Sequence, residues 1–238
     1  MPPSLENVHS WLTSAARGGR GLFVRWPAVR QPVKPLEVYE FESCPFCRKV
    51  REVLSEMDLD YISRSTPRGE VHKRGEVQAA GGQAMFPYLV DPNTGAAMYE
   101  SEAIIDYLHT TYGQGRSVLS KVLAPATTAT SAIASAMRPF GGRLDARRAG
   151  RPQPEQMIEL WNFEASPYCR KVREKLCALG LDYHVHNVAK GGARRAALVA
   201  RGGRMMVPYL VDANHDVGMY ESDDIVGWLE RTYGAGAA

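Results

Sequence analysis

The sequence predicts an α/β protein in which one βαβ–α–ββα unit occurs twice in tandem. The chain repeats itself: residues 36–61 read LEVYEFESCPFCRKVREVLSEMDLDY, and residues 158–183 read IELWNFEASPYCRKVREKLCALGLDY. Further on, FPYLVDPNTGAAMYESEAIIDYL at 86–108 is matched by VPYLVDANHDVGMYESDDIVGWL at 207–229. The offset is 122 residues in the first match and 121 in the second, so one residue was lost in between. At 238 residues, each copy is long enough to bury its own core.

The beginning of the first copy predicts a strand, a helix and a second strand. Residues 37–41 alternate around apolar side chains, as a strand does. After the Cys-Pro-Phe-Cys turn, Val50, Val53 and Met57 recur at helical spacing. Residues 60–63 then predict the second strand.

The rest of the copy predicts a helix, a hairpin and a last helix. The charged stretch 68–80 is expected to be helical and to end at Gly81-Gly82. Residues 88–91 and 96–99 predict a hairpin, and Ser101 is expected to cap the last helix. This order of elements is the thioredoxin arrangement.

The repeat also predicts the domain organisation. We expect an N-terminal extension at 1–34 that is partly helical, a thioredoxin-like domain at 35–113, a linker with a helix at 114–156, and a second thioredoxin-like domain at 157–238. Small residues followed by arginine and a glycine pair occur at 5–21 and 133–142, which suggests a helix before each domain.

Composition excludes several classes of protein. With 45% apolar and 23% charged residues the chain is typical of a globular protein, and a net charge of +3 does not indicate a nucleic-acid partner. Lys121 and Pro125 interrupt the longest weakly charged stretch, so we expect no membrane span. Because Glu6 and His9 interrupt any apolar core of a secretory signal, we expect a cytoplasmic protein.

Cys44 and Cys47 are the candidate catalytic residues. Four cysteines are too few for a disulfide scaffold, whereas a Cys-x-x-Cys at the start of a helix favours redox chemistry. The helix N-terminus favours the Cys44 thiolate, and Cys47, one turn further on, is the expected resolving thiol. Arg48 and Lys49 are expected to favour that thiolate, and Glu42 to oppose it.

Metal binding is the alternative for this cysteine pair. Zinc needs two further ligands at suitable spacing, which the chain does not offer nearby. An iron–sulfur cluster held with glutathione between two chains remains a second possibility. We expect no metal. His184 and His186 share one face of a strand and are expected to be structural or exposed.

The second copy has Ser166 in place of the first cysteine and keeps Cys169. A serine cannot form the mixed disulfide that thiol exchange requires. Its hydroxyl can donate a hydrogen bond to a bound thiolate. The second copy is therefore either degenerate or binds a thiol ligand without exchanging disulfides with it. Cys177 is expected to serve packing.

The motifs CPFC, FPYLVD and YES, answered by SPYC, VPYLVD and YES, resemble the N-terminal domain of glutathione S-transferases and the glutaredoxins. The resemblance covers both copies. It implies that Pro87 and Pro208 are cis and that the backbone at Phe86 and Val207 pairs with the cysteinyl part of glutathione.

The same resemblance implies that Glu100-Ser101 and Glu221-Ser222 clamp the γ-glutamyl end of glutathione. Ser166 and Cys169 then belong to the glutathione site of the second copy. Ordinary glutathione S-transferases carry an all-helical C-terminal domain that forms most of the second-substrate pocket, and this chain has another thioredoxin-like domain instead.

The function predicted on these grounds is glutathione-dependent thiol–disulfide exchange. Glutathione is the cosubstrate, and the other substrate is a disulfide or a glutathionylated protein or small molecule. Two alternatives stay open: a transferase or isomerase using glutathione, since CPFC-x-KV also resembles glutathione-dependent prostaglandin synthases, and a non-enzymatic glutathione-binding protein.

Overall fold

A computed structural model describes residues 17–117, 122, 124–136, 142–148 and 150–234 of the protein. The first repeat contains β1 (Leu36–Glu40), α2 (Pro45–Glu56), β2 (Tyr61–Ser65), α3 (His72–Gly81), β3 (Tyr88–Asp91), β4 (Ala96–Met98) and α4 (Ser101–Thr111). The second repeat contains β5 (Ile158–Asn162), α7 (Pro167–Ala178), β6 (Tyr183–Asn187), α8 (Arg195–Gly202), β7 (Tyr209–Asp212), β8 (Val217–Met219) and α9 (Ser222–Tyr233). Between them lie α6 (Ala124–Ala136) and a short 3-10 turn (Ala146–Arg148).

Both repeats have the thioredoxin arrangement that the sequence predicts. In the first, β1 pairs with β2 in parallel and with β3 antiparallel, and β3 and β4 form a hairpin. The second repeats this pattern strand for strand. No separate all-helical domain follows the repeats among the residues described, although the exact domain limits stay a prediction.

Local sequence accounts for most element ends. Leu36 and Val38 alternate with half-buried residues along β1 and point into the core. Cys44 is the N-cap of α2, with Pro45 in the first turn, where its missing N–H costs nothing. Gly82 ends α3 in the left-handed conformation, as predicted.

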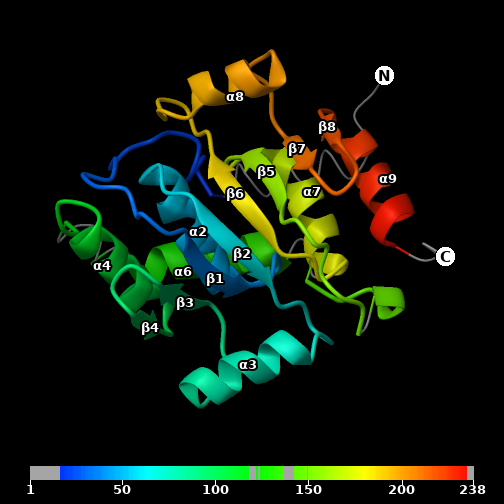
Figure 1. Ribbon diagram of the computed structural model, residues 1–238. Helices are drawn as coiled ribbons and strands as arrows, with labels where there is room; N and C mark the ends of the chain where they lie inside the picture. Colours follow the sequence, from blue (N-terminus) through cyan, green and yellow to red (C-terminus); the bar gives the residue numbers. More distant parts are fainter. Residues whose placement is uncertain (1–16, 118–121, 123, 137–141, 149, 235–238) are drawn as a thin grey trace.

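The two repeats share a single eight-stranded sheet, ordered β4-β3-β1-β2-β6-β5-β7-β8. Strands β2 and β6 run side by side through its middle, and α3 and α8 lie at opposite ends of the molecule (Figure 1). Their antiparallel register places Tyr61 opposite Val185 and Ser63 opposite Tyr183. We call this β2–β6 contact the seam. The main cluster of buried apolar residues takes members from both repeats. A smaller cluster in the second repeat contains Trp161, Val188, Leu198 and Tyr209.

Buried charged groups of α2 and α7 join the repeats on one side of the sheet. Arg51 contacts Glu40 at 2.7 Å and Glu164 of the second repeat at 3.0 Å. Arg173 reaches back to Glu42 of the first repeat at 3.1 Å and also contacts Glu164 at 2.9 Å. These side chains are at most 4% exposed. Removing one partner would leave a buried charge uncompensated, so the network ties the repeats together.

The segments outside the repeats differ from the prediction. Residues 1–16 and 137–141, where parts of two helices were predicted, lie outside the described residues. Residues 17–34 form turns and loops with one β-bridge at Phe23, and no helix. Helix α6 lies in the predicted linker but begins earlier than the 133–142 stretch, and Ser131 Oγ binds the Pro45 carbonyl 2.7 Å away. No helix of the described residues is long and apolar enough to cross a membrane.

Candidate functional site

The Cys44 thiol sits where β1 passes into α2. Its sulfur accepts a hydrogen bond from the backbone N–H of Cys47 at 3.2 Å, so it caps the helix as an Asp or Ser would. Cys44 is 3% exposed and Cys47 is fully buried. None of the four cysteines takes part in a disulfide bond in this structure. The geometry therefore places the first thiol against free helix N–H groups and the second inside the protein.

The two thiols titrate in opposite directions. Burial opposes ionisation of Cys44, but hydrogen bonds from the Cys47 thiol and from the backbone N–H groups of Cys47 and Phe46 lower its pKa. The positive charge of Arg51 acts in the same direction. Burial and the adjacent Cys44 sulfur raise the pKa of Cys47 well above its ordinary value. Such a pair has one ready nucleophile and one thiol that stays protonated.

The charges around Cys44 differ from those expected from sequence. Lys49, expected to favour the thiolate, binds Glu102 and Thr128 instead. Glu42, expected to oppose it, lies within 3.2 Å of the buried Arg51 guanidinium, which offsets its charge. Arg51 therefore supplies the helpful charge. Sequence reasoning missed it because a charged residue in mid-helix is usually solvated.

The loop before β3 forms the second wall of the site. The Phe86–Pro87 peptide bond is cis, as the resemblance implied. The Phe86 carbonyl oxygen lies 3.9 Å from Cys44 Sγ, so the structure brings these two predicted residues together. The Phe86 ring packs edge-on against Phe41, with ring centroids 6.2 Å apart.

Arg74 of α3 is a residue at this wall that the sequence analysis missed. Its guanidinium lies 4.6 Å from the centre of the Phe86 ring, and its Nη2 donates to the Thr66 carbonyl at 2.9 Å. The repeat contained the signal, because Arg195 occupies the matching place in α8 and donates to the Val188 carbonyl at 3.0 Å. A fixed positive charge beside the loop suits an anionic ligand.

The start of α4 is the third predicted part of the site, and one prediction about it is wrong. Ser101 does not cap the helix; it is the first helical residue, 5% exposed. The N-cap is Glu100, which has φ 67° and ψ 112° and makes no side-chain capping bond. The first-turn N–H groups therefore have no side-chain cap, which is the arrangement that binds carboxylates at helix ends. Lys49 ties this turn to α2 through Glu102.

The second repeat keeps the local geometry of each of these three segments without the first thiol. Ser166 Oγ accepts from the Cys169 backbone N–H at 3.2 Å, and the Val207–Pro208 bond is cis. Glu221 has φ 66° and makes no side-chain capping bond, and Ser222 begins α9 at 6% exposure.

The remaining thiols of the second repeat are buried. Burial raises the pKa of Cys169, which is fully inaccessible. Burial also raises the pKa of Cys177 to about 12. Val207 offers no aromatic ring where Phe86 does. The second repeat therefore presents a hydroxyl where the first presents a thiol.

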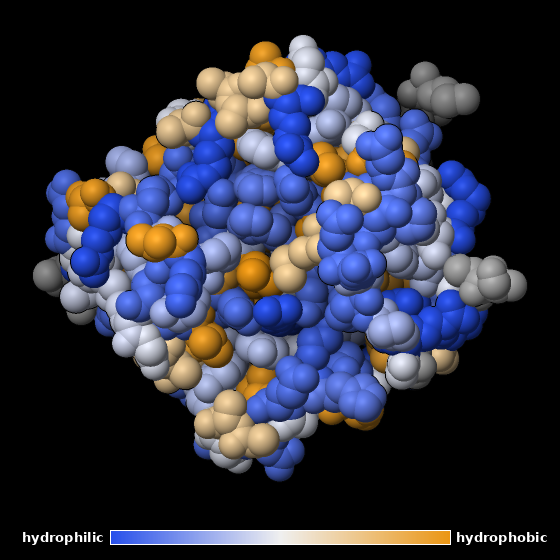
Figure 2. Space-filling model, viewed as in Figure 1, coloured by the Kyte–Doolittle hydropathy of each residue, from blue (hydrophilic) through white to orange (hydrophobic). Residues whose placement is uncertain are grey.

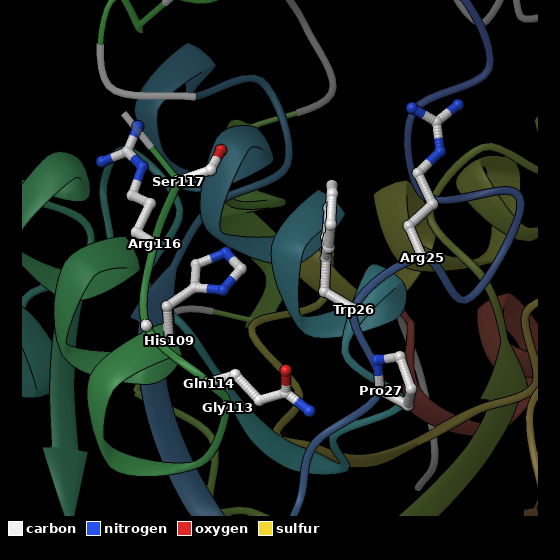
Figure 3. Close-up of a pocket in the computed structure, with 9 residues that line it drawn as sticks. Arg25, Trp26, Pro27, His109, Gly113, Gln114, Arg116 and Ser117 are labelled. Carbon is white, nitrogen blue, oxygen red and sulfur yellow. The ribbon is translucent and has the colours of Figure 1, made fainter. Parts of the chain in front are cut away.

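A separate cavity of about 200 Å³ lies between the N-terminal segment and the end of α4. His109 and Ser117 face it from one side and Trp26 from the other (Figure 3). The Trp26 backbone N–H binds the Glu56 carbonyl, so the cavity adjoins the C-terminal end of α2. A twelve-residue helix is about 18 Å long. The cavity is thus well removed from Cys44, which caps the other end.

Comparison with known proteins agrees with this geometry. The family model described as "Glutathione S-transferase, N-terminal domain" matches residues 38–116 and 160–236. No curated protein matches the chain. Among solved structures, the trimeric glutathione transferase TDR1 of Leishmania is similar at 15% identity and a TM-score of 0.32, over 85% of this chain and 69% of that one. A TM-score this low adds nothing to the assignment. The family match alone covers more than half of the chain, once in each repeat, and the chain therefore belongs to the glutathione S-transferase N-terminal domain family.

Proposed function

We propose that the protein is a glutathione-dependent thiol–disulfide oxidoreductase whose active site lies in the first repeat. The observation that carries the proposal is the position of Cys44 Sγ. It accepts the Cys47 N–H at the start of α2 and lies 3.9 Å from the Phe86 carbonyl before a cis-proline. The lowered pKa of Cys44 and the raised pKa of Cys47 support a division into nucleophile and resolving thiol.

The proposed first step transfers glutathione to Cys44. The Cys44 thiolate attacks the glutathione sulfur of a mixed disulfide R–S–S–G. The Cys44–glutathione disulfide forms as the S–S bond of R–S–S–G breaks, and the substrate leaves as the thiolate R–S⁻, which takes a proton from water. Substrate R is a protein or a small thiol.

Two routes then restore the enzyme. A second glutathione thiolate attacks the bound glutathione sulfur, which gives glutathione disulfide and frees Cys44. Alternatively, Cys47 loses its proton and attacks Cys44 Sγ, which releases glutathione and leaves a Cys44–Cys47 disulfide for two further glutathione molecules to reduce. The raised pKa of Cys47 makes the first route the faster one.

Glutathione binding is proposed for both repeats. In the first, the Phe86 backbone would pair with the cysteinyl residue, and Glu100 and Ser101 at the uncapped start of α4 would hold the γ-glutamyl group. In the second, Val207, Glu221 and Ser222 take these places, and Ser166 would donate to the glutathione sulfur. A reducing, cytoplasmic location is part of the proposal.

The test is turnover of a glutathione mixed disulfide by the full chain, with glutathione reductase and NADPH reporting glutathione disulfide. Cys44→Ser should reduce the rate to background, whereas Cys47→Ser should keep most of it through the second-glutathione route. Cys177→Ser makes the same chemical change at a buried thiol outside the site and serves as the control.

Two outcomes would count against the proposal. Full activity in Cys44→Ser would remove the assigned nucleophile. Absence of turnover in every form, together with glutathione binding to both repeats, would favour a non-enzymatic binding protein.

A further inference from the structure

A cluster of metal-ligating side chains lies at the seam, away from the cysteine site. His184 and His186 alternate along β6 and so point to the same side of the sheet. Asp60 comes from the first repeat and immediately precedes β2, the strand that pairs with β6. One ligand atom from each of the three lies within 4.8 Å of the others. The face of the molecule drawn in Figure 2 is hydrophilic over much of its area, with hydrophobic residues among the hydrophilic ones near its centre.

The imidazoles in this cluster are fixed by neighbouring groups, but one ring nitrogen has no hydrogen-bond partner. His186 Nδ1 lies 3.2 Å from Asp60 Oδ2, and its ring stacks on Trp161 with centroids 4.3 Å apart. The Nε2 atom of His184 is buried without a hydrogen-bond partner. The Glu159 carboxylate lies 3.2 Å from His186 Nε2, the ring nitrogen that does not face Asp60. Buried polar atoms without partners call for an explanation.

The first repeat shows what normally occupies this place. There Arg64 bridges Glu37 at 2.9 Å and Asp182 at 3.0 Å. In the second repeat His186 stands between Glu159 and Asp60 in the same manner. The backbone N–H groups of Ser65 and Asn187 each bind the neighbouring aspartate at 3.0 Å, so the two arrangements correspond closely. The matching positions, first repeat then second in each pair, are Glu37 and Glu159, Ile62 and His184, Arg64 and His186, and Lys73 and Arg194, while Asp182 corresponds to Asp60.

The exchange of Ile62 and Arg64 for two histidines removes a permanent positive charge from between two carboxylates. Imidazoles restore that charge only when they take up a proton or bind a metal ion. A second histidine in place of an isoleucine adds a ligand atom that proton binding alone does not need. Two imidazoles with a carboxylate form a donor set that suits zinc, copper, nickel or cobalt.

We propose that Asp60, His184 and His186 bind one divalent transition-metal ion of the zinc class. Metal binding requires neutral imidazole. The ion would take ligands from both repeats and clamp the seam.

Arg194 is the group that opposes metal binding. Its Nε lies 2.6 Å from Asp60 Oδ2, and a guanidinium repels a cation. The same contact fixes the carboxylate in one orientation, as groups behind metal ligands commonly do. Lys73 stands at the matching place in the first repeat and binds Asp182 there. Both repeats therefore have a positive charge at the Lys73/Arg194 position. Arg194 does not compensate for the loss of the Arg64 charge, because the first repeat has both Lys73 and Arg64.

The test measures metal retained by the full chain with Cys44→Ser and Cys47→Ser, because thiolates would compete for the same ions. Zn²⁺ binding is measured by equilibrium dialysis, and the Cu²⁺ form is examined by electron paramagnetic resonance for coupling to ligand nitrogens. The double exchange His184→Ile with His186→Arg gives the second repeat the residues of the first and is the matched variant.

One equivalent of Zn²⁺ and nitrogen coupling in the Cu²⁺ spectrum are expected, with both lost in the double exchange. Asp60→Asn should weaken Zn²⁺ binding by about tenfold or more, on the scale of perturbed metal ligation, while the amide oxygen still accepts from Asn187. No retained metal, or unchanged stoichiometry in the double exchange, would overturn the proposal. Circular dichroism reports folding of each variant, and Asp60→Asn decides the matter if the double exchange does not fold.

Discussion

Cys44 and Ser166 each accept a hydrogen bond from the backbone N–H three residues on, at 3.2 Å in both repeats. Behind them the frame is equally alike: both prolines are cis, and Glu100 and Glu221 have φ of 67° and 66°. The repeats differ at the reacting atom, thiol in one and hydroxyl in the other. The comparison shows that the backbone frame does not depend on the thiol, since the second repeat keeps the frame with a hydroxyl in its place.

The strongest way to break this distinction is to restore the missing thiol. Ser166→Cys in the Cys44→Ser/Cys47→Ser background should create thiol–disulfide exchange where there was none, because the new thiol meets the same helix N–H groups. Removing a catalytic nucleophile typically costs about 10³-fold or more, and part of that should return. Turnover of a glutathione mixed disulfide measures it. Activity no higher than in the parent background would mean that the second frame does not support exchange.

The next largest effect concerns the buried charges that join the repeats. Glu164→Gln removes the carboxylate that Arg51 and Arg173 share. We expect this change to lower the free energy of unfolding by about 3–5 kcal/mol, because it leaves buried positive charge uncompensated. Glu40→Gln should cost only about 1 kcal/mol, because the second repeat already has Asn162 at that position. Urea unfolding at pH 7 measures both, and equal costs would contradict the assigned roles.

Acid unfolding tests the same pair through pH. Despite burial, Arg173 and Arg51 lower the pKa of Glu164 from 4.5 to about 2. Its ionised form therefore stabilises the fold above pH 4.5, and this contribution is lost as the pH falls towards 2. Burial raises the pKa of Glu40, so its contribution is present in acid and is lost as the pH rises through the folded-state pKa. Glu164→Gln should flatten the acid loss of stability, and Glu40→Gln should not.

A smaller effect is expected in the reactivity of the four thiols. Because the pKa of Cys44 is lowered from 9.0, its alkylation should reach half its maximal rate below pH 9. Each unit of lowering gives roughly tenfold more thiolate at pH 7. Cys47, Cys169 and Cys177 have raised pKa values and should stay unmodified. Mass spectrometry of iodoacetamide-treated protein over a pH series identifies the labelled residue, and first labelling at Cys177 would be inconsistent with this order.

The smallest effect should be equal in the two repeats. Glu100→Gly and Glu221→Gly relieve a backbone conformation that costs a non-glycine residue about 1–3 kcal/mol, although glycine loses more entropy on folding. A net gain of about 1 kcal/mol in unfolding free energy is expected from each. Glutathione affinity, measured by calorimetry, should fall in both. Stability gained without loss of affinity would show that these glutamates do not bind the ligand.

The fold within each repeat was predictable because its signals are local. Strand alternation in β1, the Cys-Pro turn and the Gly82 stop each depend on neighbours in sequence, and the structure confirms them. The Ser101 cap was wrong because a serine before a helix can stand either at the cap or one place inside. Only the backbone angle of Glu100 distinguishes the two.

The seam could not be predicted in the same way. Pairing of β2 with β6 joins residues more than a hundred positions apart, and the sequence of neither strand identifies the strand with which it pairs. Arg51 and Arg173 look like solvent-facing helix residues until that pairing buries them. His184 and His186 were expected to be structural or exposed, and their relation to Asp60 depends on the same register. The parts of the candidate site inside one repeat were therefore accessible to sequence reasoning, and those across the seam were not.

The seam also determines how the sheet ends. A free strand edge is a template on which another chain can add, and proteins protect or shorten such edges to avoid uncontrolled growth. Here β2 and β6, five residues each, pair with one another inside a single chain. The outermost strands are β4 and β8, of three residues each. Duplication thus pairs the longer edge strand of each repeat with that of the other repeat. The edges that remain exposed are three-residue strands, on which a further strand could form few hydrogen bonds.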